Sequence, residues 1–97
     1  MKNKKPKMTV NKLGTKRWNL NGKPHREDGP AVEMPSGYKA WYKHGLRHRA
    51  DGPAKEWADG YKEWWLNGDY YETKQEWRAA LRPLKIKIVL DSRQEQV

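Results

Sequence analysis

A repeat with a period of about 23 residues runs through the middle of this chain and constrains its fold more than any other feature. Trp18, Trp41 and Trp64 follow one another at equal steps along the sequence. The block His-Arg-Glu-Asp-Gly-Pro-Ala that begins at His25 returns one period later as His-Arg-Ala-Asp-Gly-Pro-Ala, beginning at His48. A fixed period of this length indicates stacked supersecondary units, each too small to bury a core alone. Two full units and a third half-unit fit between about residues 18 and 71.

The pattern inside each unit is that of a β-hairpin. Short segments that begin at Gly-Pro, residues 30–34 and 53–57, lead into turns that contain glycine. Aromatic-rich segments follow over residues 38–43 and 61–66, and such residues favour strands. The sequence therefore predicts a mainly β fold, a meander of 23-residue β-hairpin repeats.

Side chains alternate between the two faces of a strand, and this alternation separates the tryptophans from the other aromatic residues. Because tryptophan recurs at the equivalent position of each unit, we expect Trp18, Trp41 and Trp64 to stack as a core ladder. Lysine stems on the same face would cover the rings. The opposite face carries more variable aromatic residues and is the better candidate for contact with a partner.

After the repeats the pattern changes to that of a helix. Thr73 and Glu76 form a capping box, and Trp77, Ala80 and Leu81 form a stripe at helical spacing. A short repeat array needs capping, and we expect a C-terminal capping helix and strand to supply it. The predicted organisation is a basic flexible arm over 1–14, repeats over 15–71, and a capping helix, strand (84–90) and tail over 72–97.

The net charge of +9 is concentrated at the N-terminus. Residues 1–17 carry seven lysines and arginines and no acid, whereas residues 18–68 carry eight positive and seven negative side chains. The repeats are thus almost neutral, and the basic character belongs to the arm.

The motif of the repeats resembles the MORN repeat. The segment from Tyr42 to His48, aromatic-x-His-Gly-x-x-His, and the turn Asp59-Gly60-Tyr61 match its frame over about residues 18–71. The Arg-x-Asp-Gly-Pro-Ala step departs from the usual glycine-rich motif and is similar to a MORN-like variant of small phage and bacterial proteins. The resemblance implies an elongated sheet of hairpins that serves as a scaffold for protein or lipid contact, without catalytic residues.

Two histidine–aspartate pairs are the candidates for chemistry: His25 with Asp28, and His48 with Asp51. Their spacing suits a metal ligand set or a general base, but their repetition in each unit favours a structural role in the turn before Gly-Pro. His44 occupies a turn position where the next unit has Asn67. There is no cysteine, no phosphate-binding loop and no nucleophile motif. We therefore expect no metal, no cofactor and no enzymatic activity.

The leading hypothesis is non-catalytic binding of a protein or nucleoprotein partner. By resemblance to small phage proteins, the chain would be a phage-encoded inhibitor that occludes a host protein, acting in the host cytoplasm. No apolar run is long enough to cross a membrane, which also favours a cytoplasmic location. The expected partner-binding residues are Tyr38, Tyr42, Tyr61, Trp65, Arg47 and Arg49.

The alternative is a direct nucleic-acid-binding protein. In this case the lysines of the arm would neutralise phosphates and the exposed aromatic residues would stack on bases. The arm residues concerned are Lys2, Lys4, Lys5 and Lys7. Two plainer interpretations stay open: a lysine tail that only keeps the chain soluble, and aromatic residues that only pack the sheet.

Overall fold

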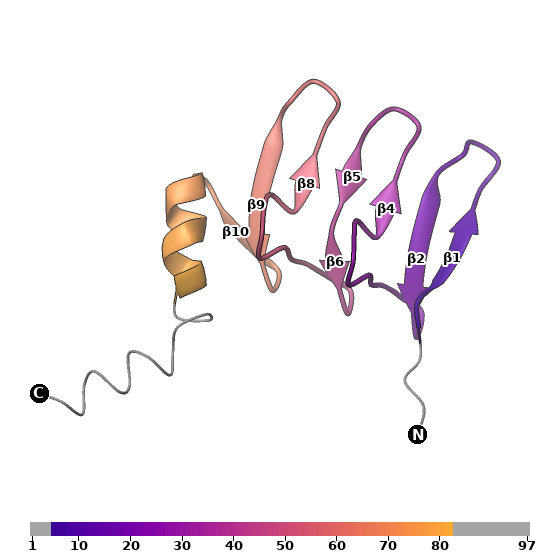
Figure 1. The fold of residues 1–97 in the computed structure, drawn as a ribbon, viewed down its shortest axis with the longest axis horizontal. Helices are drawn as coiled ribbons and strands as arrows, with labels where there is room; N and C mark the ends of the chain where they lie inside the picture. Colours follow the sequence, from indigo (N-terminus) through magenta and orange to yellow (C-terminus); the bar gives the residue numbers. More distant parts are fainter. Residues whose placement is uncertain (1–4, 83–97) are drawn as a thin grey trace, which may run out of the picture.

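The segments that begin at Gly-Pro and the aromatic-rich segments pair as antiparallel hairpins that lie side by side (Figure 1). The computed structural model describes residues 5–82. In chain order the strands are β1 (Lys7–Val10), β2 (Lys16–Leu20), β3 (Lys23–Pro24), β4 (Val32–Glu33), β5 (Lys39–Ala40), β6 (Tyr42–Lys43), β7 (Leu46–Arg47), β8 (Lys55–Glu56), β9 (Lys62–Leu66) and β10 (Asp69–Tyr71).

Eight of these strands form one antiparallel sheet. Its order is β1-β2-β4-β5-β8-β9-β10, with β3 paired to β2, and β6 pairs with β7 separately. Neighbours in the sheet are neighbours along the described chain, apart from the short strands of the connecting segments. The predicted mainly β meander with a C-terminal helix is confirmed.

The array contains three long hairpins, not the two and a half units expected from the repeat (Figure 1). β1 pairs with β2 along its full length. The prediction of a flexible arm over 1–14 is therefore wrong for residues 7–14, while residues 1–4 lie outside the described part. The first unit keeps its turn glycine, Gly14, one period before Gly37, but it lacks the Gly-Pro start that identifies the later units. Backbone pairing holds β1 in place without that signal.

Two kinds of turn alternate along the array. At the hairpin tips, three-residue loops place a glycine at positive φ, as at Gly37 and Gly60. At the opposite edge, two-residue turns have positive φ at Asn21, His44 and Asn67 and at the glycine after each. Left-handed φ at both central residues is the type I′ turn that suits the twist of a hairpin. His44 is thus a turn residue, as expected.

A helix over residues 74–82 of the described part lies beside β9 and β10 and ends the array (Figure 1). The capping box is present in part, because the Glu76 N–H donates to Thr73 Oγ1 at 3.1 Å. The apolar stripe faces the sheet, where Trp77 and Leu81 form a buried cluster with Leu66. The predicted capping helix is confirmed, and the predicted strand over 84–90 lies outside the described residues. Within residues 5–82, no helix has the length and apolar character needed to span a membrane.

Candidate binding surfaces

The sheet has two chemically different faces, and adjacent residues of β9 show the division. Trp64 and Trp65 point to opposite sides of the strand. Trp64 contacts the ring of Trp77 in the helix, whereas Trp65 contacts Tyr70 of β10. We call the side of Trp18, Trp41 and Trp64 the indole face. The aromatic face is the opposite side and consists of Tyr38, Tyr42, Trp57, Tyr61, Trp65 and Tyr70.

Arginine side chains cover the first two rings of the indole face. The guanidinium carbon of Arg26 lies 3.7 Å from the centroid of Trp18, and that of Arg49 lies 3.8 Å from the centroid of Trp41. Each arginine also bridges the sharp turn before Gly-Pro. Arg49 donates from Nε to Asp51 at 2.9 Å and from Nη1 to the carbonyl of Pro53 at 3.0 Å. The repeated Arg-x-Asp-Gly-Pro motif is therefore a brace that fixes each connecting segment onto a ring.

The predicted ladder of directly stacked indoles is wrong. Within residues 5–82 no ring contact joins Trp18, Trp41 and Trp64 to one another. Equivalent strands lie two strand spacings apart, about 9–10 Å, which exceeds the reach of a ring pair. A planar guanidinium from the connecting segment fills the space, and lysine stems do not take this place over Trp18 and Trp41.

The histidines of the repeated motif bind backbone. His25 Nδ1 accepts from the N–H of His44 at 2.8 Å, and His48 Nδ1 accepts from the N–H of Asn67 at 2.9 Å. His25 is 3% exposed, and its Nε2 donates to Glu27. One ring nitrogen of each histidine thus holds the type I′ turn of the next unit, which favours the structural role. Among the described residues, no three His, Cys, Asp or Glu side chains gather as a metal site would require.

Ring contacts link the aromatic face from one hairpin to the next. The centroids of Tyr38 and Trp57 are 5.0 Å apart, as are those of Trp57 and Tyr61. Trp65 and Tyr70 form a second pair at 5.2 Å. Tyr61 and Tyr70 stay 54% and 47% exposed, so large ring surfaces remain in contact with solvent.

Charged side chains lie between the two aromatic groups. The Lys55 ammonium lies 5.9 Å from the Trp57 ring and 5.8 Å from the Trp65 ring, and it is 4.0 Å from Glu63. Burial lowers the pKa of Lys55, and the neighbouring Arg47 lowers it further against the opposing effect of Glu63. The surface is therefore amphipathic: rings at its ends and an ion pair at its centre.

Arg47 carries an unsatisfied donor on this face. Its guanidinium carbon lies 4.7 Å from the Trp65 centroid, and its Nε is buried without a hydrogen-bond partner in the described part of the chain. Buried donors in folded proteins are nearly always paired. The Arg47 guanidinium thus packs against the aromatic face, with its Nε closed to solvent.

Of the six residues predicted to bind a partner, five lie on the aromatic face and one does not. Tyr42 pairs across the strands with Arg47, and Arg47 contacts Trp65. Arg49 instead covers Trp41 on the indole face, so the structure does not bring it together with the other five. Arg49 follows Arg47 by two residues, a spacing that would put both on one face of a strand. It lies in the connecting segment after β7, however, where strand alternation no longer applies.

Sequence reasoning missed Trp57 and Tyr70, which complete the ring contacts of the aromatic face. A signal for Trp57 was present: it precedes the tip turn, two residues after Lys55, and period-2 spacing puts both on one face. Tyr70 follows the Asn-Gly turn, and its pairing opposite Trp65 depends on the register of that turn.

Two of the four lysines proposed as a nucleic-acid arm lie in the described part of the chain. Lys7 belongs to β1, and Lys5 lines a hollow beside Trp18. Lys2 and Lys4 lie outside the described residues.

Comparison with protein-family models, with curated proteins and with solved structures finds no match for this chain. The resemblance to the MORN repeat thus stays a prediction from the motif, and the function must be argued from the geometry of the two faces.

Proposed function

We propose that this chain is a non-catalytic binding protein that binds a partner protein through its aromatic face. The observation that carries the proposal is the continuous group of half-exposed rings from Tyr38 through Trp57 to Tyr61. Tyrosine, tryptophan and arginine contribute most of the energy in protein interfaces.

The polar groups of the face favour a protein over a purely apolar partner. The Lys55–Glu63 pair offers one group of each sign beside the rings. Such mixed surfaces, with aromatic anchors and a few oriented polar groups, are typical of specific interfaces.

Occlusion is the mode of action that we propose for a scaffold of this kind. The braces at Arg26 and Arg49 hold consecutive units in one arrangement, so the face is organised before binding and little ordering is needed. A partner site covered by such a surface would be closed to its other ligands, as in the hypothesis of a phage-encoded inhibitor of a host protein.

The test is capture of partners by the immobilised full chain, with and without nuclease treatment, compared among variants. Tyr61→Ser and Tyr70→Ser remove exposed rings from the aromatic face, and Leu13→Ser is the matched control because Leu13 is 81% exposed at the tip of the first hairpin. We expect a protein that the wild type and Leu13→Ser retain after nuclease treatment and that both tyrosine variants lose. Retention by all three variants, or loss of everything after nuclease treatment, would contradict the proposal.

A further inference from the structure

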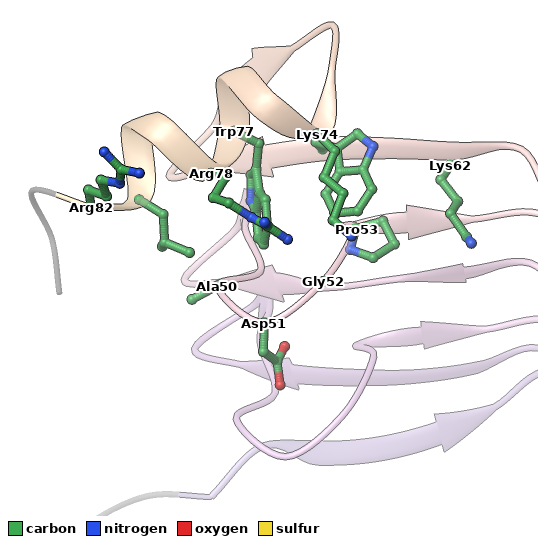
Figure 2. A pocket seen from close by; sticks show the side chains of 11 residues that line it. Ala50, Asp51, Gly52, Pro53, Lys62, Lys74, Trp77, Arg78 and Arg82 are labelled. Atoms are coloured by element: carbon green, nitrogen blue, oxygen red, sulfur yellow. The ribbon is translucent and has the colours of Figure 1, made fainter.

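A cavity of about 590 Å³ lies on the indole face where the helix meets the last hairpin (Figure 2). Lys62 and Trp64 of β9 contribute to its wall, and Lys74, Trp77 and Arg78 of the helix form the opposite side. Figure 2 shows Lys62 and Arg82 at opposite ends, with Lys74, Trp77 and Arg78 between them. Its volume falls in the range of small-molecule sites, about 300–1,000 Å³.

The lining of the cavity differs from that of the earlier units because the repeat stops there. In the first two units the residue eight positions after the tryptophan is an arginine that covers the ring, Arg26 over Trp18 and Arg49 over Trp41. Eight positions after Trp64 the chain has Glu72, and no Arg-x-Asp-Gly-Pro segment follows. Trp77 contacts the Trp64 ring instead, at 4.8 Å and a tilt of 50°. At the equivalent place one unit earlier, a hollow of about 490 Å³ beside Trp41 is lined by Arg49 and by three acids, so the end of the array differs in its lining and not in being hollow.

The two tryptophans form a fixed aromatic wall. Trp77 is 5% exposed, and its Nε1 donates to the carbonyl of Arg49 at 3.1 Å, which sets the plane of its ring. The Lys74 ammonium lies 5.8 Å from the Trp64 ring. An aromatic ligand would thus meet a Trp64 ring that Trp77 already holds in place, with a cation beside it.

The charge of the lining is strongly positive. Four cations line the cavity, and none of them belongs to an ion pair in the described part of the chain: Lys62, Lys74, Arg78 and Arg82. The one acid of the lining, Asp51, is already bound by Arg49 at 2.9 Å. Cations without an ion pair in the described part also occur within the repeats, as at Lys39 and Arg47, so the cavity is distinguished by the gathering of four of them around one hollow.

We propose that this cavity binds a nucleotide, with its base against Trp64 and its phosphate on the flanking cations. Bases stack on aromatic side chains whatever their sequence, and lysine and arginine bind phosphate. A ligand with charge alone would leave the Trp64 ring unused, and an apolar ligand would leave four cations unpaired. The spread of cations from Lys62 to Arg82 fits successive phosphates of a single strand, and a free nucleotide presents the same chemistry. This site lies on the face opposite the proposed partner surface and does not depend on it.

Fluorescence anisotropy with the full chain tests the proposal. The probes are a labelled oligothymidylate of about ten nucleotides, which suits typical single-strand sites, and thymidine monophosphate as competitor. Lys62→Gln, Lys74→Gln and Arg78→Gln should each weaken oligonucleotide binding about five- to tenfold at low salt. Each should also lower the slope of log affinity against log salt by about 0.7, because one phosphate contact is lost.

Lys39→Gln is the matched control, because Lys39 is the exposed equivalent of Lys62 one unit earlier and lies outside the cavity. It removes the same charge from the same sheet, and we expect less than a twofold change. Stacking is tested without touching the fold by an abasic oligomer of equal length, which should bind about tenfold more weakly than oligothymidylate.

Two results would support the proposal and distinguish the source of the nucleotide. An oligomer that binds far more tightly than thymidine monophosphate assigns the site to a single strand, and equal affinities assign it to a free nucleotide. The proposal is overturned if neither binds, if Lys39→Gln and Lys62→Gln weaken binding equally, or if the abasic oligomer or a polyglutamate peptide binds as tightly as oligothymidylate.

Discussion

The guanidinium of Arg49 lies flat enough over Trp41 to bring its carbon within 3.8 Å of the ring centroid, while its nitrogens bind the segment that leads to the next hairpin. One side chain thus joins an indole of one unit to the backbone of the following unit. Arg26 repeats the arrangement with Trp18. This brace, and not contact between indoles, links neighbouring hairpins beyond the strand pairing of the sheet.

Replacement of Arg49 should therefore destabilise the whole array. We expect Arg49→Ala to lower the free energy of unfolding by about 2–3 kcal/mol, since a cation–π contact and charge-assisted hydrogen bonds are lost together. Arg49→Lys should recover less than half of this loss, because an ammonium lacks the planar fork. Urea denaturation measures both, with Lys43→Ala as control for an exposed cation; equal stability of Arg49→Lys and the wild type would contradict the prediction.

The hairpin tips provide a second test, with two glycines in equivalent positions. A methyl group at Gly37 would lie 2.9 Å from Cβ of Ala58 in the next tip, whereas one at Gly60 meets nothing within 4 Å. Both have positive φ, so alanine costs about 1–2 kcal/mol at either site. Gly37→Ala should cost about 1–3 kcal/mol more, from overpacking between units.

Thermal or urea unfolding measures that difference, and Ala58→Gly supplies the control. In the double variant Gly37→Ala with Ala58→Gly, the extra loss should disappear. Equal losses for Gly37→Ala and Gly60→Ala would show that adjacent tips do not pack.

The helix should be as important to stability as a repeat. Trp77→Ala removes the contact with Trp64 and the hydrogen bond to Arg49, and we expect a loss of about 3–5 kcal/mol. Tyr61→Ala, at an exposed ring, should cost less than about 1 kcal/mol. If Trp77→Ala changes the denaturation midpoint no more than Tyr61→Ala does, the helix is not a cap.

Acid should weaken the fold through His48. Burial lowers the pKa of His48 and Lys43 lowers it further, with Glu27 acting in the opposite direction. The unfolded chain then binds the proton more readily, so the free energy of unfolding is unaffected by this group above the ordinary histidine pKa of about 6.5 and falls as the pH decreases below it. A protonated Nδ1 also cannot accept the N–H of Asn67.

Denaturation at pH 7.5 and 5.5 checks this prediction, with His48→Gln as the variant that cannot titrate. The wild type should lose more stability between the two pH values than His48→Gln does. Identical losses would show that the proton on His48 does not oppose folding.

The repeat period predicted the second and third hairpins and their turns, and the capping box with its apolar stripe predicted the helix. Strand alternation also placed Tyr38, Tyr42, Tyr61 and Trp65 on one face, since the side-chain direction in a strand follows from position alone. It did not give the direction of Arg49, because this residue lies in an irregular segment whose side chains are placed by packing. β1 was missed because its segment, Lys7–Val10, has neither the Gly-Pro start nor the aromatic residues that identify the later units. The lining of the cavity depends on the absence of an Arg-x-Asp-Gly-Pro segment after Trp64. Its shape depends on the helix that occupies the end of the array, which the repeat does not predict.

A double-mutant cycle tests the central claim, that arginine braces and not indole contacts hold consecutive units together. The free energy of unfolding is measured for three single variants, Arg49→Met, Trp41→Leu and Trp64→Leu. It is also measured for two double variants, which combine Trp41→Leu with Arg49→Met or with Trp64→Leu, and the differences give the two coupling energies. The account predicts a coupling of about 1–2 kcal/mol between Arg49 and Trp41. It predicts additivity within about 0.5 kcal/mol for Trp41 and Trp64. Strong coupling between the two tryptophans, with none between Arg49 and Trp41, would contradict it.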